Sequence, residues 1–198
     1  MLVGMSPRAR PRTPEERRSE LTDVTLRLMR LQGRDVTTRQ IAEAAGVAEG
    51  TIFRAFSSKE ELVDAALARA FEPGDLVARI EEIDRGLPLQ DRLVLVVSIL
   101  QQRFRATFGL MQKVGLVRPP EHVHHSDAAV AWRARLTELF RDVVGEDADR
   151  LTVPVDQLMH VLRLLTFAGS HDHVADGHLL TPDEIVDIVL HGTLKKDS

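Results

Sequence analysis

The segment Thr37–Leu62, "TTRQIAEAAGVAEGTIFRAFSSKEEL", contains two short helical patterns and the beginning of a third. Thr37 followed three residues later by Gln40 matches a capping box, which predicts the start of a helix. Gly46 stands where a residue of left-handed conformation would end that helix. A second short helix is expected over about 48–56. The two helices would therefore meet at a tight turn.

Two further helices are expected on either side of this pair. Apolar residues recur at helical spacing from Glu15 to Gln32, and a glycine follows. Ser58 and Glu61 form a second capping box, which predicts a helix that runs to about Phe71. Two short helices joined by a turn and braced by another helix form a helix-turn-helix, an arrangement that many DNA-binding proteins use.

The remaining chain also has the periodicity of helices. We expect them over 75–84, 89–116, 127–144, 155–174 and 182–194. The sequence has no credible strand pattern and no internal repeat. It therefore predicts an all-α protein of about nine helices.

Charge is distributed unevenly along the chain. The net charge of the whole chain is −4, but residues 1–59 carry 11 Lys and Arg against 7 Asp and Glu, whereas residues 60–198 carry 15 against 23. A basic front and an acidic rear indicate a module that faces a polyanion, attached to a body that avoids one.

Composition favours a globular protein and fits a reducing cytoplasm. Hydrophobic residues make up 43% of the sequence, and there is no cysteine. No apolar run approaches the roughly 20 residues that cross a bilayer, and the basic N-terminus lacks the apolar core of a signal peptide. We expect no membrane association and a cytoplasmic location.

The opening segment resembles the DNA-binding module of the tetracycline-repressor (TetR) family of bacterial regulators, and the resemblance covers about residues 15–71. The matching stretches are Thr37-x-Arg39-x-Ile41-Ala42, Ala45-Gly46-Val47, Gly50-Thr51-Ile52-Phe53 and Phe56-x-Ser58-Lys59-Glu60.

The resemblance implies a DNA-binding homodimer that binds a near-palindromic operator. A small-molecule effector would release the protein from this operator. It implies a basic arm over 1–13, a helix-turn-helix domain over 14–60, and a helical ligand-binding and dimerisation domain over 61–198. The linking helix that ends near Phe71 would set the separation of the two DNA-binding heads.

The resemblance also implies which residues contact DNA: Thr37, Thr38, Ala48, Glu49, Thr51, Phe53, Arg54 and Lys59. Three of these depart from the family pattern. Ala48 replaces a hydroxyl residue that would cap the helix, and Phe53 stands where tyrosine is usual. Glu49 should repel phosphates unless it accepts a hydrogen bond from a cytosine amino group. In the alternative interpretation, its negative charge only stabilises the positive end of its own helix.

The N-terminal arm supplies a second source of positive charge. Arg8, Arg10 and Arg12 lie in "MLVGMSPRARPRT". They could offset the weak charge of the helix-turn-helix by entering the minor groove. The alternative is a solvated tail that does not touch DNA.

The rear of the chain offers residues for a pocket and for a dimer surface, although an ordinary core explains the same apolar residues. The pocket candidates are Val97, Gln101, Phe104, Phe108, Trp132, His160 and Thr166. By family analogy, the dimer candidates are Leu158, Leu162, Leu165, Gly169, Ile185 and Ile188. The scarcity of charge among the pocket candidates favours an apolar or aromatic effector.

No catalytic, cofactor or metal site is expected. His122, His124 and His125 lie in a loop with prolines, and His171 and His173 would not share a helix face. Two alternatives stay open. One is a DNA-binding regulator controlled by a protein partner without a small ligand, and the other is an enzyme with a metal-dependent rear domain.

Overall fold

The computed structural model describes residues 12–120 and 126–191, and these residues are helical with no strand. They form nine α-helices, α1–α6 and α8–α10, together with two short 3-10 helices. The prediction of an all-α fold is confirmed. The chain divides into two compact units, Met1–Ala70 and Phe71–Ser198. The boundary between the units falls at the end of helix α4, which runs from Lys59 to Phe71.

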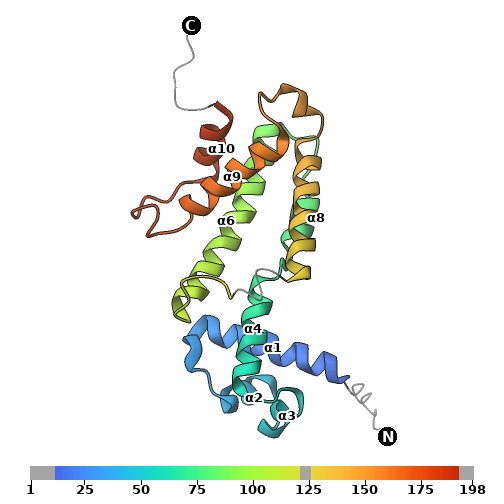
Figure 1. Ribbon diagram of the computed structural model, residues 1–198, viewed down its shortest axis with the longest axis vertical. Helices are drawn as coiled ribbons and strands as arrows, with labels where there is room; N and C mark the ends of the chain where they lie inside the picture. Colours follow the sequence, from blue (N-terminus) through green and yellow to red (C-terminus); the bar gives the residue numbers. More distant parts are fainter. Residues whose placement is uncertain (1–11, 121–125, 192–198) are drawn as a thin grey trace, which may run out of the picture. The chain divides into compact units, whose positions relative to one another are not determined.

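The N-terminal unit contains four α-helices (Figure 1). Their bounds are Pro14–Gln32 for α1, Thr38–Ala45 for α2, Glu49–Ala55 for α3 and Lys59–Phe71 for α4. Helix α1 contacts both α2 and α3, and α2 contacts α3. The short pair α2 and α3, braced by α1, is the helix-turn-helix that the sequence predicts.

The ends of α2 follow from the local sequence. The Gln40 backbone N–H donates to the Thr37 hydroxyl at 3.2 Å, and the Thr37 backbone N–H donates to the Gln40 side chain at 2.8 Å. Gly46 ends the helix in the left-handed region, at φ 65° and ψ 36°. Both predicted features are confirmed, and they fix where the chain turns towards α3.

The core of this unit is formed by side chains from all four helices and from the loop before α2. The fully buried members are Leu21, Met29, Val36, Ile41, Ile52, Phe56 and Leu62. Ala42 is also buried, and its small side chain allows α2 to lie close to its neighbours. The inner face of α3 is therefore fixed by packing, which leaves its other face open.

The C-terminal unit is built around the long helix α6 (Figure 1). The bounds are Leu76–Glu81 for α5, Leu89–Lys113 for α6, Asp127–Val144 for α8, Val155–Gly169 for α9 and Pro182–His191 for α10. Helix α6 contacts each of the other four helices, and α9 also contacts α8 and α10. The predicted helix over 182–194 is described only as far as His191.

Helix α9 is shorter than the prediction of 155–174. It ends at Gly169, and the chain turns before it returns along the helix end, where the Leu180 backbone N–H donates to the Gly169 carbonyl at 3.0 Å. A Cβ at Gly169 would lie 3.1 Å from Leu180 atoms. The close approach of the returning chain therefore explains why a glycine stands here.

A buried arginine holds the end of α8. Arg92 of α6 is 5% exposed and donates to the carbonyl of Val143 and, at 3.4 Å, to that of Val144. It also forms an ion pair with Asp147 in the 3-10 helix Gly145–Arg150. The positive charge lies where the carbonyl groups of a helix end are unpaired, so it stabilises the terminus of α8.

Helix α6 alone is long and apolar enough to cross a bilayer, when the described residues are judged by length and composition. Core helices of soluble proteins meet the same criterion. In this structure α6 lies among α5, α8, α9 and α10, and its buried residues belong to the shared core. Packing inside the unit therefore accounts for the 39% of its apolar window that is buried.

Candidate nucleic-acid interface

Helix α3 exposes the face that the sequence assigns to DNA. Ile52 points into the core with no exposed surface, whereas Phe53 is 53% exposed. Glu49 and Arg54 are exposed as well, and Thr51 is half-buried. The outer face of α3 thus offers a carboxylate, an aromatic ring and a guanidinium to a ligand.

The first turn of α3 lacks a side-chain cap. Ala48 is the N-cap residue and makes no side-chain hydrogen bond there. The sequence predicts this loss, because alanine has no oxygen to accept from the first N–H groups. Glu49 follows as an acidic residue of the first turn, which the helix dipole favours.

The beginnings of α2 and α4 supply the other predicted residues. Thr37 is exposed, and its hydroxyl is engaged in the capping box of α2. Thr38 is half-buried and donates its hydroxyl to the Glu49 carboxylate. Lys59 is the first residue of α4 and is half-buried. The structure thus brings Thr38 and Glu49 into contact, a pairing that the sequence did not reveal.

Arg18 of α1 holds the end of α3 opposite to Glu49. It donates to the Ala55 carbonyl at 2.5 Å and to the Glu61 carboxylate at 2.7 Å. Its guanidinium lies 4.0 Å from the centre of the Phe56 ring. One side chain therefore joins α1 to the last turn of α3 and the first turn of α4, and so fixes α3 within the unit.

Glu61 is the carboxylate at the centre of this network. It accepts from the hydroxyl and the backbone N–H of Ser57, both at 2.7 Å, and from Arg18. These hydrogen bonds, with the Ser57 hydroxyl as the largest cause, lower the pKa of Glu61 from 4.5 to about 2. The predicted capping box at Ser58 is half present, because the Glu61 N–H donates to the Ser58 hydroxyl at 3.1 Å while its carboxylate turns to Ser57.

Sequence inspection missed the role of Arg18. It lies 43 residues from Glu61 in the chain, and no short motif links the two. Only the folding of α1 against α3 and α4 brings them together. From the sequence alone, a basic residue near the start of a bracing helix predicts only a solvent-exposed charge.

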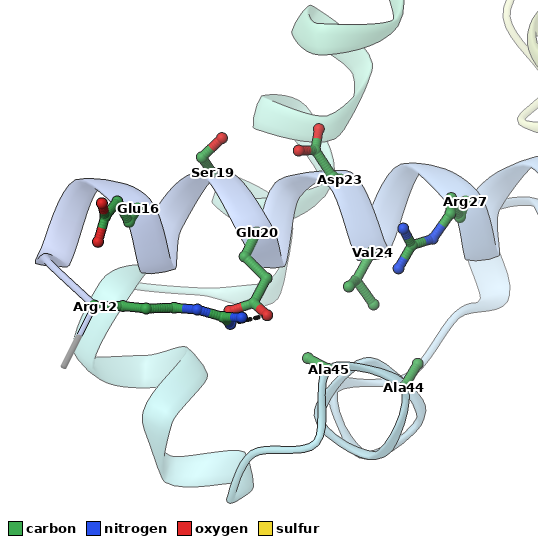
Figure 2. Close-up of a pocket in the computed structure, with 9 residues that line it drawn as sticks. All are labelled: Arg12, Glu16, Ser19, Glu20, Asp23, Val24, Arg27, Ala44 and Ala45. Carbon is green, nitrogen blue, oxygen red and sulfur yellow. Dashed lines mark ion pairs between the residues drawn. The ribbon is translucent and has the colours of Figure 1, made fainter. Parts of the chain in front are cut away.

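A hollow of about 480 Å³ opens between α1 and α2 (Figure 2). Val24 points from α1 towards Ala44 and Ala45 of α2, and the Glu20 side chain reaches the Arg12 guanidinium. Other residues around it are Arg12, Glu16, Ser19 and Asp23. Charged side chains of both signs dominate its rim, so it differs from the apolar pockets that enclose small ligands.

One arginine of the predicted arm is described, and it contacts the protein. Arg12 forms an ion pair with Glu20 of α1, and its hydrogen bond is the largest cause of the lowered pKa of Glu20 (Figure 2). Arg8 and Arg10 lie outside the described residues, as do the loop residues His122, His124 and His125.

The expected pocket residues of the C-terminal unit are scattered between core and surface. Val97, Gln101 and Thr166 are buried, Phe104, Phe108 and Trp132 are half-buried, and His160 is exposed. Gln101 donates to the Leu180 carbonyl and Thr166 to the Leu162 carbonyl, each at 2.7 Å. The two buried polar candidates are thus bonded within the chain.

Phe104 and Phe108 instead belong to an aromatic cluster. Their rings lie 5.4 Å and 4.9 Å from that of Phe167, and the Phe108 ring lies 4.5 Å from that of His171. The buried Nδ1 of His171 has no hydrogen-bond partner among the described residues. Phe167 and His171 were not among the pocket residues that we predicted from the sequence.

The predicted dimer residues lie mostly inside the unit. Leu158, Leu162 and Ile185 belong to its core, with 4%, 0% and 0% of their surface exposed, and Gly169 is covered by Leu180. These four residues are covered by their own chain and expose little surface. Leu165 is half-buried and Ile188 is 38% exposed.

Other apolar residues of the same helices are exposed. Val161, Leu164 and Phe167 of α9 are 44%, 49% and 44% exposed. Helix α9 has a polar side with Asp156, His160 and Arg163, but its apolar residues extend beyond the buried side, so the sequence did not show which of them face outwards. The contacts of α9 with α6, α8 and α10 make that distinction.

Within the described part of the chain, no group of three or more His, Asp or Glu side chains is placed to hold a metal ion.

A helix-turn-helix whose recognition helix exposes a polar and aromatic face defines a class of DNA-binding proteins. Comparison with known protein families identifies the family within this class. The family model described as "Bacterial regulatory proteins, tetR family" matches residues 21–66. The HTH-type transcriptional repressor KstR of Rhodococcus jostii (strain RHA1) is 40% identical over 162 residues, which cover 77% of this chain and 68% of that protein.

The chain therefore belongs to the TetR family and is a DNA-binding transcriptional regulator. Solved structures agree on the fold. A tetR-family regulator from Streptomyces coelicolor has a TM-score of 0.56 at 24% identity, with 89% of this chain and 78% of that one covered. The regulator FadR from Bacillus subtilis, in complex with stearoyl-CoA, has a TM-score of 0.61 at 15% identity, with 89% and 99% covered.

Proposed function

We propose that this protein is a homodimeric transcriptional repressor that binds a near-palindromic operator and leaves it when a small-molecule effector binds. The observation that carries the proposal is the exposed face of α3 in a chain whose 40% identical relative is a transcriptional repressor. Because the operator would be chromosomal, we place the protein in the cytoplasm.

The N-terminal unit supplies the DNA contacts in this proposal. Helix α3 enters the major groove, where Arg54 can donate to a guanine edge. Thr37 and Lys59 stand at the N-termini of α2 and α4, where free N–H groups and the helix dipole favour a phosphate. The hydrogen bonds of Arg18 keep α3 in place during these contacts.

The C-terminal unit supplies the dimer surface. We assign this role to Val161 and Leu164 of α9 and Ile188 of α10, which are exposed and apolar on two contacting helices. A twofold dimer presents the same surface from each subunit. A near-palindromic site requires the two copies of α3 in the dimer to lie about one turn of DNA apart, near 34–36 Å.

We place the effector in the same unit. The cluster of Phe104, Phe108, Phe167 and His171 supports an apolar or aromatic molecule, because aromatic rings stack well with such ligands. The effector would release DNA by binding more tightly to the dimer in which the two α3 helices have the wrong separation. Helix α4 leads in sequence from one unit to the other and would carry this change.

The operator test uses the full-length protein and the DNA upstream of its own gene. We expect the protein to protect a near-palindromic site there from nuclease cleavage, with two protected half-sites about one helical turn apart. Absence of protection at every near-palindromic sequence tested would contradict the proposed repressor.

A regulator without a small-molecule effector is the second candidate. The hydrogen bonds of Gln101 and Thr166 within the chain favour it, because a pocket needs polar groups that are available to a ligand. Screening apolar and aromatic compounds against the protein–operator complex separates the two candidates. Release by any compound class supports the effector, and release only by a cell protein supports the second candidate.

A further inference from the structure

The side chain of Glu49 lies at a position from which it can contact the edge of a base. It is exposed and is the first residue of α3, the helix that we propose to enter the major groove. Side chains near the N-terminus of a recognition helix are those that contact base edges. The position of Glu49 is thus that of a contact residue, although its charge is unfavourable near phosphates.

Thr38 holds the Glu49 carboxylate. Its hydroxyl donates to Oε1 of Glu49, across the turn between α2 and α3. Thr38 is itself half-buried in α2, so the donor is anchored. The bond leaves Oε2 with no hydrogen-bond partner among the described residues. An acceptor that is already oriented loses less conformational freedom when it binds.

The charge of Glu49 is not neutralised by this contact. Threonine is an uncharged donor, and no arginine, lysine or histidine in the described part of the chain forms an ion pair with Glu49. A fixed carboxylate in the major groove is favourable only opposite a hydrogen-bond donor. The donors there are the N4 amino group of cytosine and the N6 amino group of adenine.

We propose that Glu49 is a specificity-determining residue that accepts a hydrogen bond from the amino group of a cytosine or adenine in the operator, and that Thr38 is the positioning residue for this contact. The proposal rests on the proposed function, since it concerns the DNA that α3 contacts. The proposal favours a base contact over the other interpretation that the sequence left open, in which Glu49 only stabilises the positive end of its own helix.

The experiment measures binding of the full-length dimer to an operator library with every half-site position varied. For Glu49→Ala, we expect the preference for cytosine or adenine at one position of each half-site to fall about tenfold, with the other preferences unchanged. Glu43→Ala is the matched control, because it removes an exposed carboxylate from α2. The control should keep the preference at every position.

Thr38 is tested by two variants that differ in the hydroxyl. Thr38→Val should weaken the preference at the same position, and Thr38→Ser should keep it. In the Glu49→Ala background, Thr38→Val should cause no further loss at that position, because the two residues act through one contact. A purely structural role of Thr38 would lower affinity for all sites without changing the preference at one.

Two outcomes would overturn these assignments, and they differ from each other. If Glu49→Ala strengthens binding to every sequence alike and leaves all preferences intact, Glu49 only repels phosphates and the contact is wrong. If the wild-type protein binds the library with no sequence preference, the proposed operator binding itself is wrong.

Discussion

Single side chains of the N-terminal unit fall into two groups by their partners. Phe53 and Arg54 are exposed on α3, whereas Arg18 and Glu61 are bonded within the unit. The first group is available to DNA, and the second determines where α3 lies. Substitutions in the two groups should therefore have different effects.

Arg54 belongs to the group that is available to DNA. We expect Arg54→Ala to weaken operator binding by about 1–3 kcal/mol, because a lost arginine contact to a base edge costs that much. Titration of labelled operator measures the change. Arg34→Ala is the control, since Arg34 is also exposed but lies between α1 and α2, outside α3. Equal losses in both variants would mean that Arg54 contributes only charge.

Glu61 should make folding sensitive to acid. Its pKa is about 2 instead of 4.5, so the folded state favours the carboxylate. The resulting stabilisation is complete above pH 4.5 and is lost as the pH falls towards 2. The wild type and Glu61→Gln should thus differ in free energy of unfolding at neutral pH, and the difference should shrink in acid.

Denaturant titrations at several pH values measure this difference. Glu60→Gln serves as the control, because Glu60 is an exposed neighbour on the same helix. Its effect should be small throughout. A Glu61→Gln difference that stays constant down to the acid limit would count against the network of Ser57 and Arg18.

At the scale of helices, the sequence predicts termini well where a local chemical signal exists. The Thr37 and Gln40 capping box and the left-handed Gly46 are examples. The end of α9 was placed five residues too late, near Val174, because no local signal marks it. It depends on the return of Leu180 to Gly169, which is a contact made only in the folded chain.

Two glycines of the helix-turn-helix should respond oppositely to alanine. Gly46 has φ +65°, so Gly46→Ala should destabilise the fold by about 1 kcal/mol through backbone strain. Gly50 lies inside α3, where Gly50→Ala should stabilise by up to about 1 kcal/mol. A Cβ at either position would meet no atom within 4 Å, so backbone preference alone is compared. Thermal unfolding of both variants measures the effects, and a shift in the same direction for both would contradict this account.

At the scale of the whole molecule, the sequence could not assign inner and outer faces to its most apolar helices. Leu158 and Ile185 were expected at a dimer surface and lie in the core, whereas Leu164 is exposed. Periodicity identifies a helix, but when its apolar residues extend beyond one side only the neighbouring helices decide which of them are buried. For the same reason, the sequence could not separate buried from exposed residues among the pocket candidates.

Dimerisation should depend on the exposed face of α9. A charge placed inside an apolar interface is costly, so Leu164→Glu should convert the dimer into monomers at micromolar concentration. Leu95→Glu is the control, because Leu95 is similarly exposed, at 41% against 49%, but lies on α6. Light scattering measures the mass of each variant. A dimer that survives Leu164→Glu would place the interface elsewhere.

The ion pair of Arg92 inside the C-terminal unit has a consequence for how the protein responds to ionic strength. Counterions screen exposed charges but reach buried ones poorly, and the side chains of Arg92 and Asp147 are only 6% and 20% exposed. Contacts with DNA phosphates, in contrast, weaken steeply as salt is added. Concentrated potassium chloride should therefore remove the regulator from DNA while the C-terminal unit keeps its folded structure, so that dissociation from DNA and unfolding are separable events.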